Sequence, residues 1–303
     1  MSANIKRLKA RIRSVDSTLH LTKAMQLVAA GKIRKATEQL SNSRRYCEAV
    51  RSVVSALARS SECRDSLYVK GPAPEKGGKT VLIVVAGDRG LAGGYNANAF
   101  RLADTIQADE IIPIGRRSVD RVANHHPDKK SELGGQATEA FKPEDSKKLA
   151  EELCERYMAG EIARIQIVST TYVTIMTQTA VLSTLLPLSE CVLPESRRMG
   201  FKSKKADGAD EADGEAKAES LLMEFEPGAA EVMSVAIPEY LSSIIYGLVR
   251  ESFASEIAAR RVAMDAATKN GIVMKDNLSL EYNRARQGAI TQEITEIVAG
   301  AGR

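Results

Sequence analysis

The chain has 303 residues, of which 44% are hydrophobic and 27% charged, and its formal net charge is +4. This composition is typical of one large folded domain or two modest ones and excludes a disordered chain. The longest strictly apolar run, at residues 81–86, is too short to span a bilayer, and no secretory h-region follows the N-terminus. Only 4% of the residues are aromatic and Trp is absent, which favours long helices over a compact globule.

The residue types that carry catalysis or bind metals are sparse. The cysteines Cys47, Cys63, Cys154 and Cys191 are widely spaced, which favours neither a zinc site nor a disulfide framework and suits a reducing compartment. The sequence has three His residues and shows no Ser/His/Asp arrangement, paired-carboxylate spacing or metal cluster. It therefore predicts no catalytic residue, no cofactor and no metal.

Residues 1–60 predict one long helix with a coiled-coil face. They contain no Pro and a single Gly, and apolar side chains follow a heptad pattern throughout. The seam positions of this heptad are Ile5, Leu8, Ile12, Val15, Leu19, Thr22, Gln26, Ala29, Ile33, Ala36, Leu40, Ser43, Cys47, Val50, Val54 and Leu57. Such a helix spans roughly 80 Å, which is too long for the core of an ordinary globular domain.

The same helix is strongly basic. Residues 1–59 carry 13 Lys or Arg and three acids, a local net charge of about +10. The surface of this helix opposite the seam, its basic back, therefore has three possible roles. It is a solvated face, a surface for nucleic acid or anionic lipid, or a site for an acidic protein partner. The few aromatic residues argue against nucleic acid, which usually also needs stacking. A basic N-terminus also resembles a transit peptide, but the unbroken heptad from Ile5 favours a structural helix.

Residues 80–195 predict an α/β domain that interrupts the helical pair. A linker rich in Gly and Pro at 62–79 leads to the apolar run at 81–86, which is typical of a strand buried on both faces. Further strands are expected at 110–114, 164–170 and 179–186, and helices at 96–108, 116–126 and 143–159. This alternation predicts a Rossmann-like domain with a mostly parallel sheet. The low-complexity, partly acidic residues 200–219 predict a mobile loop.

The turn GDRGLAGGYN at residues 87–96 lies where a doubly wound fold binds phosphate, between the first strand and the next helix. It contains neither the phosphate-loop lysine motif nor the dinucleotide glycine spacing, which argues against a nucleotide site. The other interpretation is a tight structural turn. In that turn Gly90, Gly93 and Gly94 would allow positive φ or close backbone approach, and Asn96 would cap the helix.

Residues 236–303 predict a second long helix, because no proline follows Pro238. Its expected seam is weaker, with 11 apolar positions of 17. This seam consists of Leu241, Ile245, Leu248, Ser252, Ser255, Ala259, Val262, Ala266, Lys269, Val273, Asp276, Leu280, Asn283, Gln287, Ile290, Ile294 and Ile297. Small side chains in both seams let two helix axes approach closely. The predicted fold class is α/β: a long antiparallel coiled coil of the terminal helices with an inserted Rossmann-like domain. The alternative is two helices packed separately on that domain.

These motifs resemble the gamma subunit of F-type ATP synthases, the central stalk. The resemblance is carried by LTKAM at 21–25 with QLVAA and KIR after it, by DRGL at 88–91 with GGYN at 93–96, and by ITQE at 290–293 followed by Glu296 and GA at 300–301. The runs at 251–268 and 282–287 fit as well, so the likeness covers nearly the whole chain. Two features depart from the family. Arg261 stands where the family usually has an apolar residue, often Met, and the insertion at 200–219 is longer than expected.

The resemblance implies a rotor shaft, without catalytic residues of its own, in a proton-translocating ATP synthase. Its coiled coil would enter the ring of alpha and beta subunits, and its α/β domain would meet the epsilon subunit and rest on the membrane c-ring. The implied location is peripheral, on the cytoplasmic face of a bacterial membrane, with no direct bilayer insertion and no nucleic acid. The start at Met1 without a presequence also favours a bacterial protein.

By the same resemblance, contacts with the beta subunit are expected from Lys23, Met25, Arg260, Gln287, Thr291 and Glu293. The spacing of Gln287 and Thr291 puts both on one helix face. Gln287 could instead be a polar seam residue that fixes the register of the coiled coil. Two other functions stay open at this point: a nucleotide-binding α/β protein that uses the turn at 87–96, and a basic coiled-coil adaptor for nucleic acid or membrane.

Overall fold

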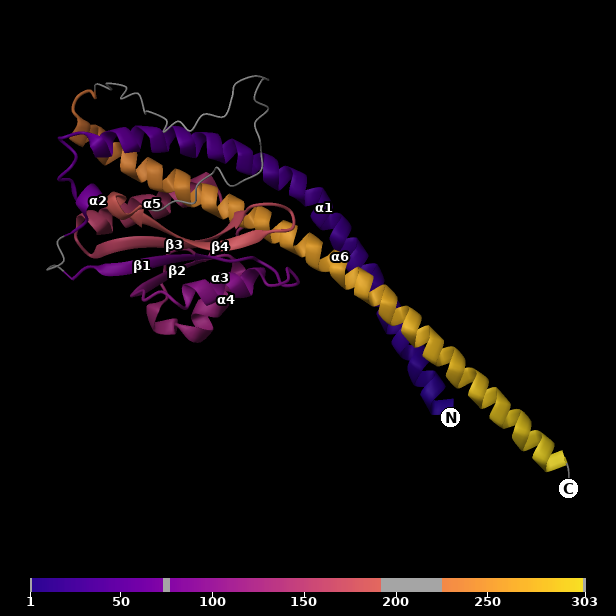
Figure 1. Ribbon diagram of the computed structural model, residues 1–303. Coiled ribbons are helices and arrows are strands. Elements are labelled where there is room, and N and C mark those ends of the chain that lie inside the picture. Colours follow the sequence, from indigo (N-terminus) through magenta and orange to yellow (C-terminus); the bar gives the residue numbers. More distant parts are fainter. Residues whose placement is uncertain (1, 73–76, 192–224, 302–303) are drawn as a thin grey trace, which may run out of the picture.

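The structure, a computed structural model, describes residues 2–72, 77–191 and 225–301 (Figure 1). Two long helices, α1 (Ser2–Arg59) and α6 (Ala229–Ala301), form a rod, and an α/β domain lies beside one end of it. This confirms the predicted fold class. The acidic loop predicted at 200–219 lies outside the described residues.

The two long helices pair antiparallel. Polar contacts across the pair join Gln26 to Asp265 (3.0 Å), Thr22 to Thr268 (2.9 Å) and Asp16 to Lys275 (2.5 Å), so residue numbers fall on α1 as they rise on α6. An apolar cluster continues the interface through Ala29, Ile33, Ala36, Leu40, Ala254, Ile257 and Ala258. Every predicted seam position of α1 is buried or half-buried. The heptad pattern of the first helix therefore identified its contact face correctly.

Helix α6 begins at Ala229 rather than near residue 236, and Pro238 lies inside it. A proline inside a helix removes one backbone N–H donor and normally kinks or breaks the helix. Here the neighbouring side chains Ile237 and Tyr240 are buried in the main core, which holds this part of the helix in place. The prediction of the helix start was wrong because tertiary packing outweighed the local effect of the proline.

The predicted seam of α6 is wrong from Ser252 onward, because these positions do not face α1. The stripe that contains Ser252 and Ser255 faces the α/β domain, where both hydroxyls bond to Thr170. Contact with α1 comes from another side of α6, first at Gly247 and Glu251 and then at Thr268 and Gly271; Met264 and Leu278, on the same stretch, are buried. Past the α/β domain, the predicted stripe is no longer buried by any neighbouring element of the described chain. Its residues Val273, Leu280, Ile294 and Ile297 are 60%, 58%, 56% and 70% exposed.

The domain beside the rod contains a four-stranded sheet in the order β2-β1-β3-β4. Strands β1 (Lys79–Val85), β2 (Glu110–Ile114) and β3 (Ile162–Tyr172) are parallel, and β4 (Gln178–Leu186) pairs antiparallel with β3. The mostly parallel sheet is thus confirmed. Strand β1 is buried on both faces, as its continuous apolar run predicts.

Helices cover both faces of this sheet. Helices α3 (Tyr95–Ala103) and α4 (Arg116–His125) lie on one face, and α5 (Pro143–Met158) and the long helices lie on the other (Figure 1). Helix α3 ends at Ala103 rather than at residue 108. Short helical turns occur at Leu67–Lys70 (α2), Pro127–Lys129 and Leu188–Glu190.

Helix α6 is, within the described residues, long and apolar enough to meet a length-and-composition criterion for a membrane span. However, 56% of its apolar window is buried inside the fold. Packing against α1, α5 and β3 gives these apolar side chains a structural role.

Candidate functional site

The turn that follows β1 is organised around the carboxylate of Asp88. Its Oδ1 accepts from the backbone N–H groups of Arg116 (3.1 Å) and Thr138 (3.0 Å). Its Oδ2 accepts from the Thr138 hydroxyl (2.9 Å) and the Glu139 N–H (3.0 Å). Arg116 is the first residue of α4, so Asp88 occupies the anion-binding position at a helix N-terminus. Asp88 therefore caps α4, whereas the phosphate position expected of this turn is the N-terminus of α3, so the carboxylate organises the turn from within the chain.

The glycines of this turn have different roles. Gly93 has φ +58° and Gly94 is the N-cap residue of α3 with φ −82°. Gly90 and Gly94 meet neither expectation, because their φ angles are not positive and a Cβ would lie 3.5 Å from its nearest neighbour at Gly90 and 3.6 Å at Gly94. Sequence reasoning missed Gly87, where a Cβ would lie 2.6 Å from Cδ of Glu256. Close backbone approach is therefore required at Gly87 rather than at Gly90.

The prediction that Asn96 caps helix α3 is wrong. Asn96 lies in the first turn of α3, after the N-cap residue Gly94. Its Oδ1 accepts from the Gly87 N–H (2.9 Å) and its Nδ2 donates to the Arg89 carbonyl (3.3 Å). The Asn96 amide therefore links two residues of the turn, Gly87 and Arg89, to the start of α3 instead of capping the helix.

Strand β3 extends past the end of β1, and α6 supplies partners for the free edge. The β1 pairing ends at Val168, yet β3 continues to Tyr172. There the Thr170 N–H donates to Ser252 Oγ (2.9 Å), and Ser255 Oγ donates to the Thr170 carbonyl (3.1 Å). The Tyr172 N–H donates to Glu251 Oε1 (3.0 Å). Side chains of α6 thus satisfy buried backbone groups that no neighbouring strand reaches.

Glu251 joins three elements at this edge. Besides Tyr172 of β3, its Oε1 accepts from Nη2 of Arg44 on α1 (3.3 Å). Burial raises the pKa of Glu251 above its ordinary value, against smaller lowering effects of Arg44 and the Tyr172 N–H. The acid is therefore easier to protonate in the folded chain than in the unfolded one.

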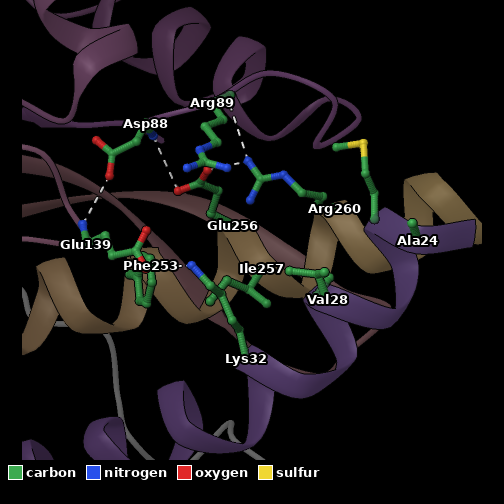
Figure 2. A pocket seen from close by; sticks show the side chains of 12 residues that line it. Ala24, Val28, Lys32, Asp88, Arg89, Glu139, Phe253, Glu256, Ile257 and Arg260 are labelled. Carbon is green, nitrogen blue, oxygen red and sulfur yellow. Dashed lines mark hydrogen bonds and ion pairs between the residues drawn. The ribbon is translucent and has the colours of Figure 1, made fainter. Parts of the chain in front are cut away.

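Arg260, predicted from the resemblance to contact the beta subunit, is engaged within the chain. Its guanidinium pairs with Glu256 and donates to the carbonyls of Arg89 (3.4 Å) and Gly90 (3.3 Å). Figure 2 shows it turned toward this turn, at the edge of a pocket of about 250 Å³ between α1 and α6. Met25 lines the same pocket, while Lys23, two residues before it, is exposed.

The other expected contact residues lie far along the shaft. Gln287, Thr291 and Glu293 are exposed, and Thr291 Oγ1 donates to the Gln287 carbonyl (3.0 Å). Since α6 rises about 1.5 Å per residue, they lie roughly 40 to 50 Å from Arg260 along the helix. Exposure of Gln287 contradicts the interpretation that it fixes the register of the α1–α6 pair. The expected contact residues therefore form two separate groups.

Arg261, which departs from the family pattern, is half-buried. Its charge contributes to the lowered pKa of Asp265 one turn along, after the larger effect of the Lys269 hydrogen bond. In the part of the chain that the structure describes, no three His, Cys, Asp or Glu side chains gather in a way that could hold a metal ion.

Together these features define a stalk-type protein. It has a two-helix shaft and an α/β domain fixed to one end of the shaft by buried polar contacts. At the other end, called the bare end below, the last turns of α6 around Gln287, Thr291 and Glu293 are exposed. The family model described as ATP synthase matches residues 4–302. The sodium-ion-specific ATP synthase gamma chain of Acetobacterium woodii is 35% identical, over 99% of this chain and 99% of the relative. The ATP synthase gamma chain of Ruminococcus albus is 37% identical, over 97% of this chain and 96% of the relative.

A solved structure shows the same fold. A chain in the cryo-EM structure of the Euglena gracilis mitochondrial ATP synthase matches with a TM-score of 0.63 at 18% identity, over 99% of this chain and 94% of that chain. The chain belongs to the ATP synthase gamma-chain family. The resemblance inferred from the sequence motifs is confirmed.

Proposed function

We propose that this chain is the central-stalk rotor subunit of a proton-translocating F-type ATP synthase. It transmits rotation of the membrane c-ring to the catalytic ring of alpha and beta subunits and has no catalytic residues of its own. The observation that carries this proposal is the bare end of the shaft. The apolar stripe of α6 from Val273 to Ile297 is exposed, first beside α1 and then on this end, where α6 extends past the start of α1 (Figure 1). Exposed apolar residues arranged in a stripe mark a surface that a partner covers.

The two ends of the molecule are proposed to contact different subunits. The shaft enters the alpha–beta ring, while the α/β domain contacts the epsilon subunit and the c-ring. The chain is a peripheral protein at the cytoplasmic face of a bacterial membrane, with neither bilayer insertion nor nucleic-acid binding. Membership of the gamma-chain family supports this arrangement, and the stalk shape is compatible with it.

We further propose that two groups of residues contact the beta subunit. Lys23, Met25 and Arg260 lie near the level where the shaft leaves the α/β domain, and Gln287, Thr291 and Glu293 lie on its bare end. Lys23 is exposed and belongs to the basic back of α1, which suits an acidic segment of the partner. Because Arg260 already pairs with Glu256, a contact there would act through the Arg260–Glu256 pair and the turn it holds.

The function is tested by assembling alpha and beta subunits with and without this chain, with the ring fixed to a surface. A bead attached to the α/β domain should rotate in one direction when ATP is added. An assembled complex that hydrolyses ATP at full rate while the bead stays still would contradict the rotor function.

A further inference from the structure

The α/β domain is joined to the shaft by chain segments at one end only. The domain follows α1 after Arg59 and precedes α6, which begins at Ala229. Arg250 lies 21 residues into α6, which is about 30 Å along the helix axis. Contacts at this level therefore form a second attachment point, separated from the covalent connections by the apolar core that α6 shares with the domain.

At this second point, the segment between Thr138 and Phe141 is held from two sides. Asp88 binds its N–H groups, as described above. From α6, Nη2 of Arg250 donates to the carbonyls of Thr138 and Phe141, the latter at 3.1 Å. Arg250 is 6% exposed, and its guanidinium lies over the rings of Tyr246 and Phe253, each at 5.4 Å. One buried cation thus connects the shaft to the segment that Asp88 ties to β1 and α4.

Stability alone does not account for a buried arginine here. Burial lowers the pKa of its guanidinium, and its Nε has no hydrogen-bond partner among the described residues. Removing a charge from water is costly, and an apolar side chain of similar volume is often equally stable or more so. What the arginine adds is direction, because hydrogen bonds fix an angle whereas apolar contacts tolerate sliding.

We propose that Arg250 is a positioning residue that fixes the α/β domain against rotation about the axis of α6, so that torque applied to the domain reaches the shaft. This inference rests on the proposed rotor function. The bonds of Ser252 and Glu251 to β3 lie within two residues of Arg250 and limit the same motion. Loss of Arg250 should therefore soften the joint without detaching the domain.

The test uses the assembled complex with the alpha–beta ring immobilised and a bead on Ala97→Cys, an exposed position of α3. Burial raises the pKa of all four native thiols, so the new cysteine reacts selectively at neutral pH. The angular variance of the bead is measured while the complex is paused without ATP. We expect Arg250→Met to raise this variance about twofold, because a loosened contact adds its own fluctuation.

The matched control is Arg121→Met. Arg121 pairs with Asp104 (2.8 Å) and lies over the Phe100 ring at 5.8 Å, so it makes similar contacts but entirely within the α/β domain. It should leave the variance at the value of the unmodified chain. Equal variance in Arg250→Met and the unmodified chain would overturn the proposal, as would an equal rise in Arg121→Met.

Arg250→Lys covers the case in which Arg250→Met does not assemble. Lysine keeps the charge but can reach only one carbonyl, so the angular variance of Arg250→Lys should exceed that of the unmodified chain; an unchanged variance would again overturn the proposal. A failure of the rotor function is distinguishable, since the unmodified chain would then not rotate with ATP.

Discussion

Besides the apolar core that the α/β domain shares with the shaft, single charged residues join the two, and their partners are distant in the sequence. Asp88 bonds to groups 50 and 51 residues away, and Arg250 to a carbonyl 112 residues away. A motif can mark such a residue, as DRGL marks Asp88, but nothing local shows that its ligand is the segment at 138–141. Arg250 is a charge within a mostly apolar helix, and the sequence pattern gave it no role.

Asp88→Ala should destabilise the folded subunit by about 3 kcal/mol, because it leaves several N–H groups and a hydroxyl without their charged acceptor. Urea unfolding of the isolated chain measures the change. Asp120→Ala is the control, since Asp120 is exposed and has only a 4.0 Å contact with Arg117; it should change stability by less than about 0.5 kcal/mol. Equal effects of the two substitutions would show that Asp88 does not organise the turn.

Glu251 predicts a particular pH dependence of stability. Burial raises its pKa above 4.5, so the folded chain binds the proton more tightly than the unfolded chain. The stabilisation is complete below the unfolded pKa and is lost as pH rises through the folded pKa. Glu251→Gln keeps an acceptor for the Tyr172 N–H and does not titrate. It should therefore gain stability relative to the unmodified chain as pH rises above 4.5, measured as the difference in urea midpoints. A difference that is constant across this range would contradict the pKa shift.

Whole elements were predictable where one partner determines the burial pattern. Helix α1 packs along one continuous side, so its heptad identified every seam position. Strand β1 is covered on both faces, and its apolar run indicated this. Helix α6 has two partners: the α/β domain contacts one side as far as Arg260, and α1 covers another side over a longer range. Periodicity selected the more apolar stripe and could not tell which partner it faces.

The corrected seam of α6 can be tested with two leucines on one helix. Leu278 is 6% exposed and Leu280 is 58% exposed. Leu278→Ala should therefore cost the isolated subunit about 2–4 kcal/mol, by loss of buried contacts and creation of a cavity. Leu280→Ala should cost less than about 0.5 kcal/mol. Thermal unfolding of both variants decides between the two stripes; a larger loss for Leu280→Ala would restore the seam expected from the heptad count.

At the scale of the whole molecule, the two groups of expected contact residues differ in how far the chain itself uses them. Arg260 is built into the fold through Glu256 and the turn at 87–96, so a substitution there changes the folded subunit as well as any contact. Gln287, Thr291 and Glu293 lie on the bare end of α6, where the described part of α1 does not cover them. The sequence motifs predicted the same role for both groups, because a motif does not show whether a residue serves the fold or contacts a partner. The bare end, like the exposed Lys23, therefore offers a test of partner contact without a change in the folded subunit, whereas Arg260 does not.

Gln287→Leu should leave the melting temperature of the isolated subunit unchanged, since the side chain is exposed and fixes no register. If Gln287 contacts the beta subunit, the assembled complex should lose ATP-driven proton pumping, because a buried polar group of the partner loses its hydrogen bond at about 1–3 kcal/mol. Gln292→Leu is the control. Gln292 is exposed on a different face of the same helix and bonds to Glu296 (2.8 Å), so pumping should be unaffected. Normal pumping with Gln287→Leu would exclude Gln287 as a contact. Equal loss in both variants would mean that added apolar surface, not a specific contact, disturbs the shaft.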